Sequence, residues 1–401
     1  MNNLDKERTF RLFTYIFLIF GVSATAIDPL IPVISKKLEV GYDKIGLALF
    51  IGSIFSLLST FISGKLSDRF DIKKITITGL LLLFFGYLLF GLHLNFIIFI
   101  LVMILIRSGF SIIDTSMHSH AAKICSNNHT PIFLKLEIFW YLGAVIGPLL
   151  ISANLFLKLD SKYTFLLFSF SFAILLVLFY KICPTKEQFN KLEMSVEKSF
   201  SKDNNNKNKS VSIKNPVVIM ISLVLFFYMG SIFGLSTWLT TYFSAFNMDI
   251  SISSMILSFY WMLSVFGLLI ARKILDRTNE ITLLFFGCLL GTICITVFSF
   301  IPVLYIKIIF LMFQAIFFSI IFSLSTSISA SENPSSVGTI LGFNIAFAFA
   351  GPIVFQPILG YVAEYIGKDY IMYVVFTGTV LGLILAFILY RILNTRNVKT
   401  K

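Results

Sequence analysis

The sequence predicts an all-α membrane protein with twelve transmembrane helices, arranged as two pseudo-symmetric bundles of six helices. Three observations lead to this fold class. Apolar residues make up 57% of the 401 positions and charged residues only 13%, whereas about a quarter of a soluble domain is charged. The apolar residues gather in runs of about 20, the length that crosses a bilayer as a helix. A short basic segment also occurs twice, about half the chain apart.

Charged segments and segments rich in Pro or Gly separate the apolar runs from one another. The expected spans are residues 12–34, 45–63, 75–93, 96–121, 136–157, 163–183, 216–240, 254–271, 281–300, 303–330, 338–360 and 370–391. Residues 1–183 would then form an N-terminal six-helix bundle and residues 216–401 a C-terminal one. The segment 184–215 is rich in Lys, Asn and Ser and has no apolar periodicity, so we expect a solvated cytoplasmic linker.

The distribution of Lys and Arg predicts the orientation of the chain. Most of the 32 basic residues fall in segments on the same side as the two termini, and a few, among them Lys307 and Lys368, fall in outer segments. The positive-inside rule therefore places both termini in the cytoplasm of a multi-pass protein of the cell (plasma) membrane. The first apolar run lacks a signal-peptide cleavage site, which predicts a retained span. Topology explains the net charge of +12, and no nucleic-acid partner is expected.

The cysteines and the short motifs argue against a metal site and against catalysis. The four cysteines show neither the spacing of metal ligands nor that of a disulfide framework; they are Cys125, Cys183, Cys288 and Cys294. The sequence contains no His-Glu-x-x-His, no Gly-x-Ser-x-Gly and no acidic metal cluster. A channel is disfavoured because a doubled set of six spans suits a rocking carrier better. We therefore expect a monomeric carrier that is not an enzyme and needs no metal or other cofactor.

The repeated basic segments are candidates for a conformational latch. The first copy is Gly64-Lys65-Leu66-Ser67-Asp68-Arg69 followed by Lys73-Lys74, and the second, 208 positions later, contains Asp276-Arg277. An Asp at the end of a span can accept hydrogen bonds from helix N-termini and from Arg, and so hold neighbouring helices together. The latch candidates are Gly64, Asp68, Arg69, Asp276 and Arg277. The alternative is a solvated loop, which the recurrence of the segment makes less attractive.

The first copy resembles the signature loop of the major facilitator superfamily, and the second has the equivalent position between the eighth and ninth spans. Asp71 departs from the pattern, which usually has Gly at that position. The resemblance extends over the whole chain in topology and in repeat spacing. It implies the major facilitator fold and transport by alternating access, in which two halves of the chain rock about a solute site.

Four short stretches resemble the fucose and glucose/mannose proton symporters of that superfamily. They are Ile27-Asp28-Pro29-Leu30-Ile31-Pro32, Gly109-x-Ser111-x-x-Asp114-Thr115, Lys135-Leu136-Glu137-Ile138-Phe139 with Leu142-Gly143-Ala144, and Phe259-Tyr260-Trp261. The chain departs from this group in its seventh span, which lacks the Glu of several relatives, and at His118, where Asn is usual. The resemblance implies a symporter for a neutral sugar.

The clearly intramembrane charges all lie in the first half of the sequence: Asp28, Arg107, Asp114 and Glu137. Such charges cost roughly 2.5 to 3.5 kcal/mol each at a helix centre and usually face a cavity. At 100° per residue, Arg107, Ser111, Asp114 and His118 form a polar stripe about 60° wide on the fourth span. Burial favours the neutral carboxyl group and a nearby Arg favours the charged one, which makes Asp28 and Asp114 the candidates for proton coupling.

Alternatives remain for each of these charges. Arg107 and Asp114 could form a static ion pair that orients helices instead of a titrating pair. Glu137 is shallow and could be an interfacial acid, although the resemblance favours a role in proton coupling. His118 lies near the cytoplasmic end of its span, where contact with water is an alternative to contact with solute.

Aromatic and amide side chains of the second half suggest a site for a neutral solute with many hydroxyl groups, since such a solute needs stacking and paired hydrogen bonds rather than charge. With His118, the candidates for substrate binding are Trp238, Trp261, Gln314 and Asn344. Alternatively, Trp238 and Tyr242 belong to the aromatic belt at the outer interface.

A second function stays open at this point. Gly143-x-x-x-Gly147-Pro148 in the fifth span resembles part of the signature of drug–proton antiporters, although its default interpretation is close helix packing. A proton antiporter that exports a drug or metabolite is therefore the alternative to a sugar–proton symporter. For both, the expected partners are a small solute, protons and the lipid bilayer.

Overall fold

The computed structural model describes residues 3–69, 72–92, 94–124, 130–183, 215–331 and 337–399. These residues form helices and short connections, and no strand occurs among them. Twelve helical segments are long and apolar enough to cross a membrane. The predicted fold class and number of spans are therefore confirmed.

The contacts of the chain divide it into two compact units. The first unit comprises residues 1–26 and 51–209, and the second comprises residues 27–50 and 210–401. The second unit thus includes segment Ile27–Phe50, which the sequence groups with the first six spans. The domain boundaries drawn from the sequence stay a prediction, whereas the contacts of this segment are argued below.

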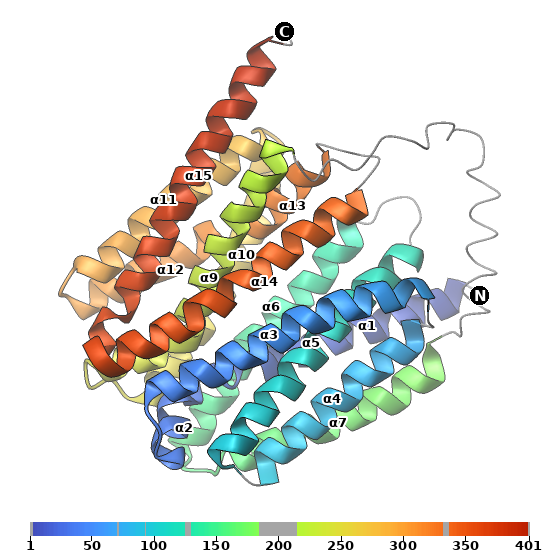
Figure 1. Ribbon diagram of the computed structural model, residues 1–401, viewed down its shortest axis with the longest axis vertical. Helices are drawn as coiled ribbons and strands as arrows, with labels where there is room; N and C mark the ends of the chain where they lie inside the picture. The colour runs from blue at the N-terminus through green and yellow to red at the C-terminus, as the bar shows by residue number, and fades with distance from the viewer. Residues whose placement is uncertain are drawn as a thin grey trace. The chain divides into compact units, whose positions relative to one another are not determined.

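The first unit pairs its long helices through small residues and aromatic rings. Its helices are α1 (Asn3–Thr25), most of α3 (Tyr42–Arg69), α4 (Ile72–Leu92), α5 (Phe96–Ile124), α6 (Thr130–Phe156) and α7 (Lys162–Ile182). Helix α1 packs on α6, and α4 packs on α5 and α7, its neighbour in Figure 1. A Cβ on Gly143 would overlap the Leu18 carbonyl oxygen, so glycine permits the close crossing of α1 and α6.

The second unit is built around α9 (Pro216–Ser244), whose residues are mostly buried. Helix α9 begins at Pro216, where the missing N–H costs no helical hydrogen bond, and Asn215 caps the helix by accepting from Val217 N–H. The other elements are η1 (Asp28–Leu30), α2 (Ile31–Leu38), the start of α3, α10 (Ile250–Leu275), α11 (Glu280–Phe300), α12 (Leu304–Phe318), α13 (Ile321–Ser331), α14 (Val337–Tyr361), η3 (Val362–Ile366), η4 (Lys368–Tyr370) and α15 (Ile371–Lys399). Helix α9 packs on α14 and α15, and α11 packs on α12 and α15.

Two spans are interrupted, a feature that the hydropathy pattern did not predict. The first span consists of α1, the 3-10 turn η1 and α2, and Pro29 in the turn cannot donate a backbone hydrogen bond. The tenth span changes from α12 to α13 at Ser319 and Ile320. Gly267 of α10 lies against this second break, where a Cβ would overlap the Ile316 carbonyl oxygen.

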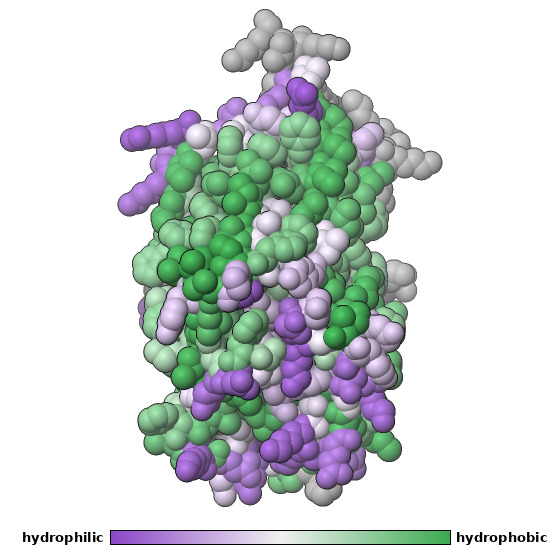
Figure 2. Space-filling model, turned by 90° about the vertical axis from the view of Figure 1, so that its left-hand side faces the viewer, coloured by the Kyte–Doolittle hydropathy of each residue, from purple (hydrophilic) through white to green (hydrophobic). Residues whose placement is uncertain are grey.

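The surface is rich in large apolar side chains, such as Ile97, Phe156 and Tyr305, each more than three-quarters exposed. On the face that Figure 2 shows, apolar residues cover much of the surface and hydrophilic residues gather toward its ends. Soluble proteins seldom expose such wide apolar areas. With the twelve spans, this surface identifies an integral, multi-pass membrane protein.

Candidate functional site

Asp28 is a buried acid at the interruption of the first span. Only 6% of the residue is exposed, and it opens the turn η1. Ser236 Oγ donates a hydrogen bond to one carboxylate oxygen at 2.7 Å, and Thr237 Oγ1 donates to the other at 3.1 Å. Both hydroxyl groups come from α9, so neighbouring residues of one helix bind both oxygens of the acid.

The contact between Asp28 and Ser236 joins equivalent positions of the sequence repeat. These residues are 208 positions apart, the same spacing that separates Asp68 from Asp276 in the two basic loops. The hydrogen bond therefore joins two residues that the spacing of the repeat relates to each other.

A second hydrogen-bonded group continues from Thr237. Trp238 is fully buried, and its Nε1 donates to Gln356 Oε1 at 2.7 Å. Gln356 Nε2 donates to Thr237 Oγ1 at 3.3 Å and to the Phe233 carbonyl oxygen at 3.5 Å. Asp28, Thr237, Gln356 and Trp238 thus form one buried polar network from η1, α9 and α14. The structure brings together two of the predicted site residues here, Asp28 and Trp238.

The alternative that placed Trp238 and Tyr242 in an interfacial aromatic belt is wrong. Their exposed fractions are 0% and 1%, because both side chains face the interior of the second unit. Trp261 of α10 is equally buried and packs edge-on against Tyr260, with ring centroids 5.4 Å apart.

Unlike Asp28, the two predicted amides, Asn344 and Gln314, have polar atoms with no hydrogen-bond partner among the described residues. Asn344 Oδ1 accepts from Ser222 Oγ at 2.7 Å, but its Nδ2 has no hydrogen-bond partner among the described residues. Gln314, near the middle of the tenth span, is 1% exposed, and neither its Oε1 nor its Nε2 finds a partner in the described part of the chain. Buried unsatisfied amides cost free energy, and they can donate to and accept from a hydroxyl group that enters.

The predicted charges of the fourth and fifth spans belong to the first unit. Arg107 and Asp114 on α5 and Glu137 on α6 are half-buried. Ser111, from the same predicted stripe, forms a 2.6 Å hydrogen bond with Ser56 of α3. The side chain of His118 lies outside the described residues. Asp28 and Asp114 thus occupy different compact units, and their joint role stays a prediction.

The latch candidates are only partly described. Nothing is described of the surroundings of Gly64, and the side chains of Asp68 and Arg69 lie outside the described part of the chain. Asp276 ends α10 and, like Arg277, is exposed. In the first basic loop, Lys73 Nζ donates to the Cys183 carbonyl oxygen at 2.7 Å and so binds the end of α7. A latch at these loops stays a prediction.

A sequence model of the Major Facilitator Superfamily matches residues 13–347, more than four-fifths of the chain. The chain belongs to this superfamily. No curated protein sequence matches it.

Solved structures of several transporters resemble this superfamily member in fold, at 12% sequence identity in each case. A bacterial homologue of the human lysosomal transporter Spinster, in its inward-facing and unoccupied conformation, has a TM-score of 0.76, with 98% of both chains covered. The D-xylose–proton symporter also has a TM-score of 0.76, with 95% of this chain and 96% of the symporter covered. The nucleoside transporter NupG has a TM-score of 0.73, with 96% and 98% covered.

Counting Lys307 with the outer segments is wrong, because the residue lies inside the tenth span, as the predicted range 303–330 already implies. This lysine lies in α12 and is 4% exposed. Its Nζ donates to the carbonyl oxygens of Phe298 at 2.8 Å and Ser299 at 3.4 Å, and to Tyr242 Oη at 2.8 Å. Those carbonyls belong to the last turn of α11, where helices leave acceptors unsatisfied and favour a cation. Hydropathy placed the start of this span before Lys307, but it could not show that the lysine side chain is buried.

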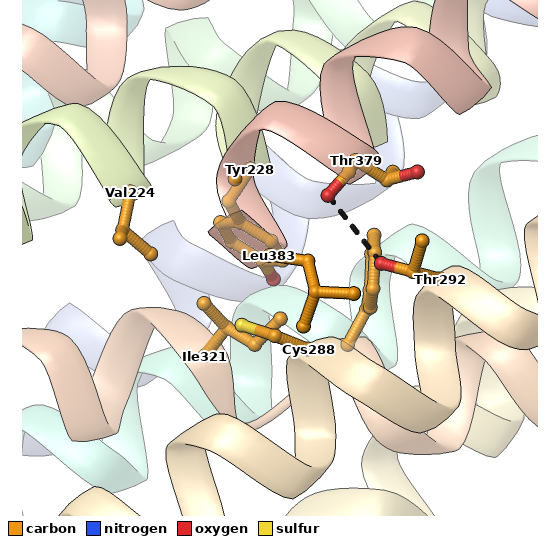
Figure 3. A pocket seen from close by; sticks show the side chains of 9 residues that line it. Val224, Tyr228, Cys288, Thr292, Ile321, Thr379 and Leu383 are labelled. Atoms are coloured by element: carbon orange, nitrogen blue, oxygen red, sulfur yellow. Dashed lines mark hydrogen bonds between the residues drawn. The ribbon is translucent and has the colours of Figure 1, made fainter. Parts of the chain in front are cut away.

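The second unit also contains a small cavity, which no residue of the Asp28 network lines. It is lined by Val224, Tyr228, Cys288, Thr292, Phe318, Ile321, Thr379, Gly382 and Leu383, and the only hydrogen bond drawn there joins Thr292 Oγ1 to the Thr379 carbonyl oxygen (Figure 3). The mostly apolar lining and a volume of about 10 Å³ leave room for one water molecule at most. Cys288 there forms no disulfide, and neither do Cys183 and Cys294, while Cys125 lies outside the described residues. Within the described residues, no group of three acidic, His or Cys side chains could hold a metal.

Proposed function

We propose that this superfamily member moves a small neutral solute with many hydroxyl groups, such as a sugar, across the cell membrane by alternating access with proton coupling. The buried carboxyl group of Asp28 carries the proposal. It is an ionisable group inside a transmembrane segment, at an interruption of the helix, and it contacts a second span through Ser236 and Thr237. Ionisable residues in such positions usually serve transport.

Proton binding is assigned to Asp28 and Asp114, with Arg107 and Glu137 as neighbouring charges that modulate it. An acid that alternates between a buried and a wetted environment takes up a proton in one and releases it in the other. Both termini would lie in the cytoplasm, and the basic loops around Asp68 and Asp276 would hold the cytoplasmic ends of the helices. One chain would suffice for the cycle.

A neutral solute is favoured by the buried side chains of the second unit. Gln314 and Asn344 offer amide donors and an acceptor that no described residue uses, and Trp238 and Trp261 offer aromatic surfaces. Such groups match hydroxyl-rich solutes, and the described residues of the second sequence half include no buried carboxylate. The similarity to the D-xylose–proton symporter agrees with this class, although similarity at 12% identity carries the fold alone.

The test is uptake of labelled hexoses, including xylose as a pentose comparison, into proteoliposomes with an imposed pH gradient. We expect concentrative uptake that collapses with a protonophore. Asp114→Asn and Asp28→Asn should abolish it and leave counterflow exchange partly intact, because exchange does not need net proton transfer. Ser231→Ala, a buried hydroxyl of α9 outside the network, serves as the control. Mutants with parental concentrative uptake would contradict the proton assignment, and extrusion of a dye without hexose uptake would favour an exporter.

A further inference from the structure

Segment Ile27–Phe50 is held against the rest of the second unit at two places, one buried and one at the surface. The buried place is Asp28 with Ser236 and Thr237. At the surface, Tyr42 N–H donates to Glu364 at 2.8 Å and Tyr365 Oη donates to Asp43 at 3.2 Å. We name Tyr42, Asp43, Glu364 and Tyr365 the surface latch.

The surface latch depends on an unusual end of α14. Residues Val362–Ile366 form a π-helical turn, closed by the Gly367 N–H on the Val362 carbonyl oxygen at 2.9 Å. Gly367 has φ of 144°, a conformation that side chains rarely adopt. The wider turn points Glu364 and Tyr365 at the N-terminal turn of α3, where a carboxylate is favoured by the unsatisfied N–H groups.

The backbones of α3 and α14 also touch directly beneath the surface latch. A Cβ on Gly46 would lie 3.2 Å from Gly360 Cα, and a Cβ on Gly360 would lie 2.6 Å from the Tyr42 carbonyl oxygen. Two glycines thus permit a close contact that larger residues would open. Gln356 lies one helical turn before Gly360 in α14, and Glu364 and Tyr365 of the surface latch follow Gly360 in η3.

A chain of contacts connects the surface latch to Asp28. The Tyr42 ring packs edge-on against the Trp238 ring at 6.1 Å between centroids. Trp238 Nε1 fixes Gln356 by donating to its Oε1, which directs the Gln356 amide N–H toward Thr237 Oγ1. Because Thr237 accepts from Gln356, its own hydrogen remains available for the Asp28 carboxylate. We name Trp238, Gln356 and Thr237 the relay.

We propose that Gln356 is a positioning residue that couples the protonation of Asp28 to the release of segment Ile27–Phe50 from α9 and α14. The inference rests on the proposed proton coupling. The relay holds Thr237 as a donor, and hydrogen bonds donated to a charged carboxylate are stronger than those to a neutral carboxyl group. Protonation therefore weakens the buried attachment, and the rings and glycines that join it to the surface latch transmit the release.

Other titratable groups near this network must be separated from Asp28. The elements packed against η1 are α2, α9 and α10. Their titratable groups are Lys36 and Lys37 of α2, both exposed, Tyr228 and Tyr242 of α9, and Tyr260, Arg272 and Lys273 of α10. Only Asp28 among them is a carboxylic acid, and Asp43 and Glu364 belong to the surface latch.

The experiment measures closure of the surface latch by chemical cross-linking in the full chain. Asp43→Cys and Tyr365→Cys are introduced after the four native cysteines are replaced, together with a protease site in segment 184–215. A bifunctional maleimide then joins the two halves, which stay together on a gel after cleavage. We expect acidification to lower the rate of cross-linking about five-fold, the effect of one weakened hydrogen bond on an equilibrium. Asp28→Asn should give a low rate at every pH.

The relay is tested by matched pairs of variants. Thr237→Val and Gln356→Leu should remove the pH response, whereas Thr237→Ser, which keeps the hydroxyl group, should preserve it. Ser231→Ala and Glu364→Gln should also preserve it, because Asp28 and not the surface latch supplies the titration. A full pH response in Thr237→Val and Gln356→Leu would overturn the relay even where uptake is proton-driven. A pH response of cross-linking without proton-driven uptake would instead refute the proposed function and leave the relay standing.

Discussion

The two helix interruptions that lie in the second unit differ in whether their buried polar groups are hydrogen-bonded. At the break of the first span, both oxygens of Asp28 accept hydrogen bonds, and Gln356 uses both ends of its amide. In the tenth span, four residues before α12 ends, Gln314 is just as deeply buried and uses neither end. The difference supports the proposal that the first break is organised for contact within the protein and the second for contact with the solute.

The physical reason lies in the cost of an unmade hydrogen bond. A satisfied polar group in an apolar interior fixes one arrangement, whereas an unsatisfied one destabilises the structure until a partner arrives. Replacing a satisfied polar group should therefore lower stability. Replacing an unsatisfied one should raise stability and weaken solute binding. The predictions below, measured as thermal stability in detergent and as solute binding, follow this contrast from the largest effect to the smallest.

The combined substitution of Ser236→Ala and Thr237→Val should lower stability most. Both hydroxyl donors to the buried Asp28 carboxylate are then lost, at a cost of about 3 kcal/mol, since hydrogen bonds to charged groups are the strongest. Thermal unfolding in detergent measures the change. Adding Asp28→Asn should restore part of the stability, because no charge is then left with fewer donors. If the double variant unfolds at the parental temperature, the network does not stabilise the second unit.

Lys307→Met should lower stability by about 2 kcal/mol, because the Phe298 and Ser299 carbonyls and Tyr242 lose their donor. Lys307 lies in the same span as Gln314 but has hydrogen-bond partners. Comparing the two shows whether stability depends on the span or on whether the polar group is hydrogen-bonded. Lys368→Met is the control, since Lys368 is half-buried and contacts the Tyr42 ring without being enclosed. Equal effects in the two variants would contradict an anchoring role of Lys307.

Gln314→Leu should raise stability by about 1 kcal/mol, because the leucine removes two unsatisfied polar atoms at similar volume. Gln356→Leu, the same change at a satisfied amide, should lower it by a comparable amount. The two variants share chemistry and differ only in their partners, so thermal unfolding of both tests the contrast directly. A loss of stability in Gln314→Leu equal to that of Gln356→Leu would remove the distinction between the two breaks.

Sequence patterns predicted the spans better than their interior contacts. Hydropathy and length determine twelve apolar runs, because each run must satisfy its own backbone hydrogen bonds in lipid. The same patterns identified Asp28 as a rare intramembrane acid. They gave no sign of Ser236 and Thr237 as its partners, since a hydroxyl group in an apolar helix usually bonds to the preceding turn of its own helix.

The sequence does not predict which residues of distant segments contact each other. The repeat spacing of 208 relates Asp28 to Ser236, but a repeat does not show which of its equivalent positions contact each other. The same spacing pairs Arg107 with Ala315 and Asp114 with Phe322, so the second half lacks those charges at the equivalent positions of its interrupted span. Lys307 was counted with the outer segments because it lies close to the predicted start of its span, and hydropathy does not show whether a lysine near a span end is buried.

The smallest change in stability is expected for Asn344→Leu, because Asn344 combines both kinds of group. Its Oδ1 is bound by Ser222 Oγ, and its Nδ2 has no partner in the described part of the chain. The leucine removes one hydrogen bond and one unsatisfied donor, and these terms nearly cancel, to within about 0.5 kcal/mol. The single Ser222 hydroxyl hydrogen is shared with the Val218 carbonyl oxygen, 2.8 Å from Oγ, so Ser222 keeps an acceptor in the variant.

Solute affinity should reveal a role of Asn344 that the small change in stability does not. If the free amide N–H meets the solute, Asn344→Leu should weaken binding about ten-fold, the worth of one lost hydrogen bond to a buried group. Ser222→Ala is the matched control, since it releases Oδ1 without removing Nδ2, and binding should then change little. Equal loss of affinity in the two variants would mean that Asn344 acts through the position of α14 rather than through its own amide. Unchanged affinity in Asn344→Leu would leave Gln314 as the amide on which solute recognition depends.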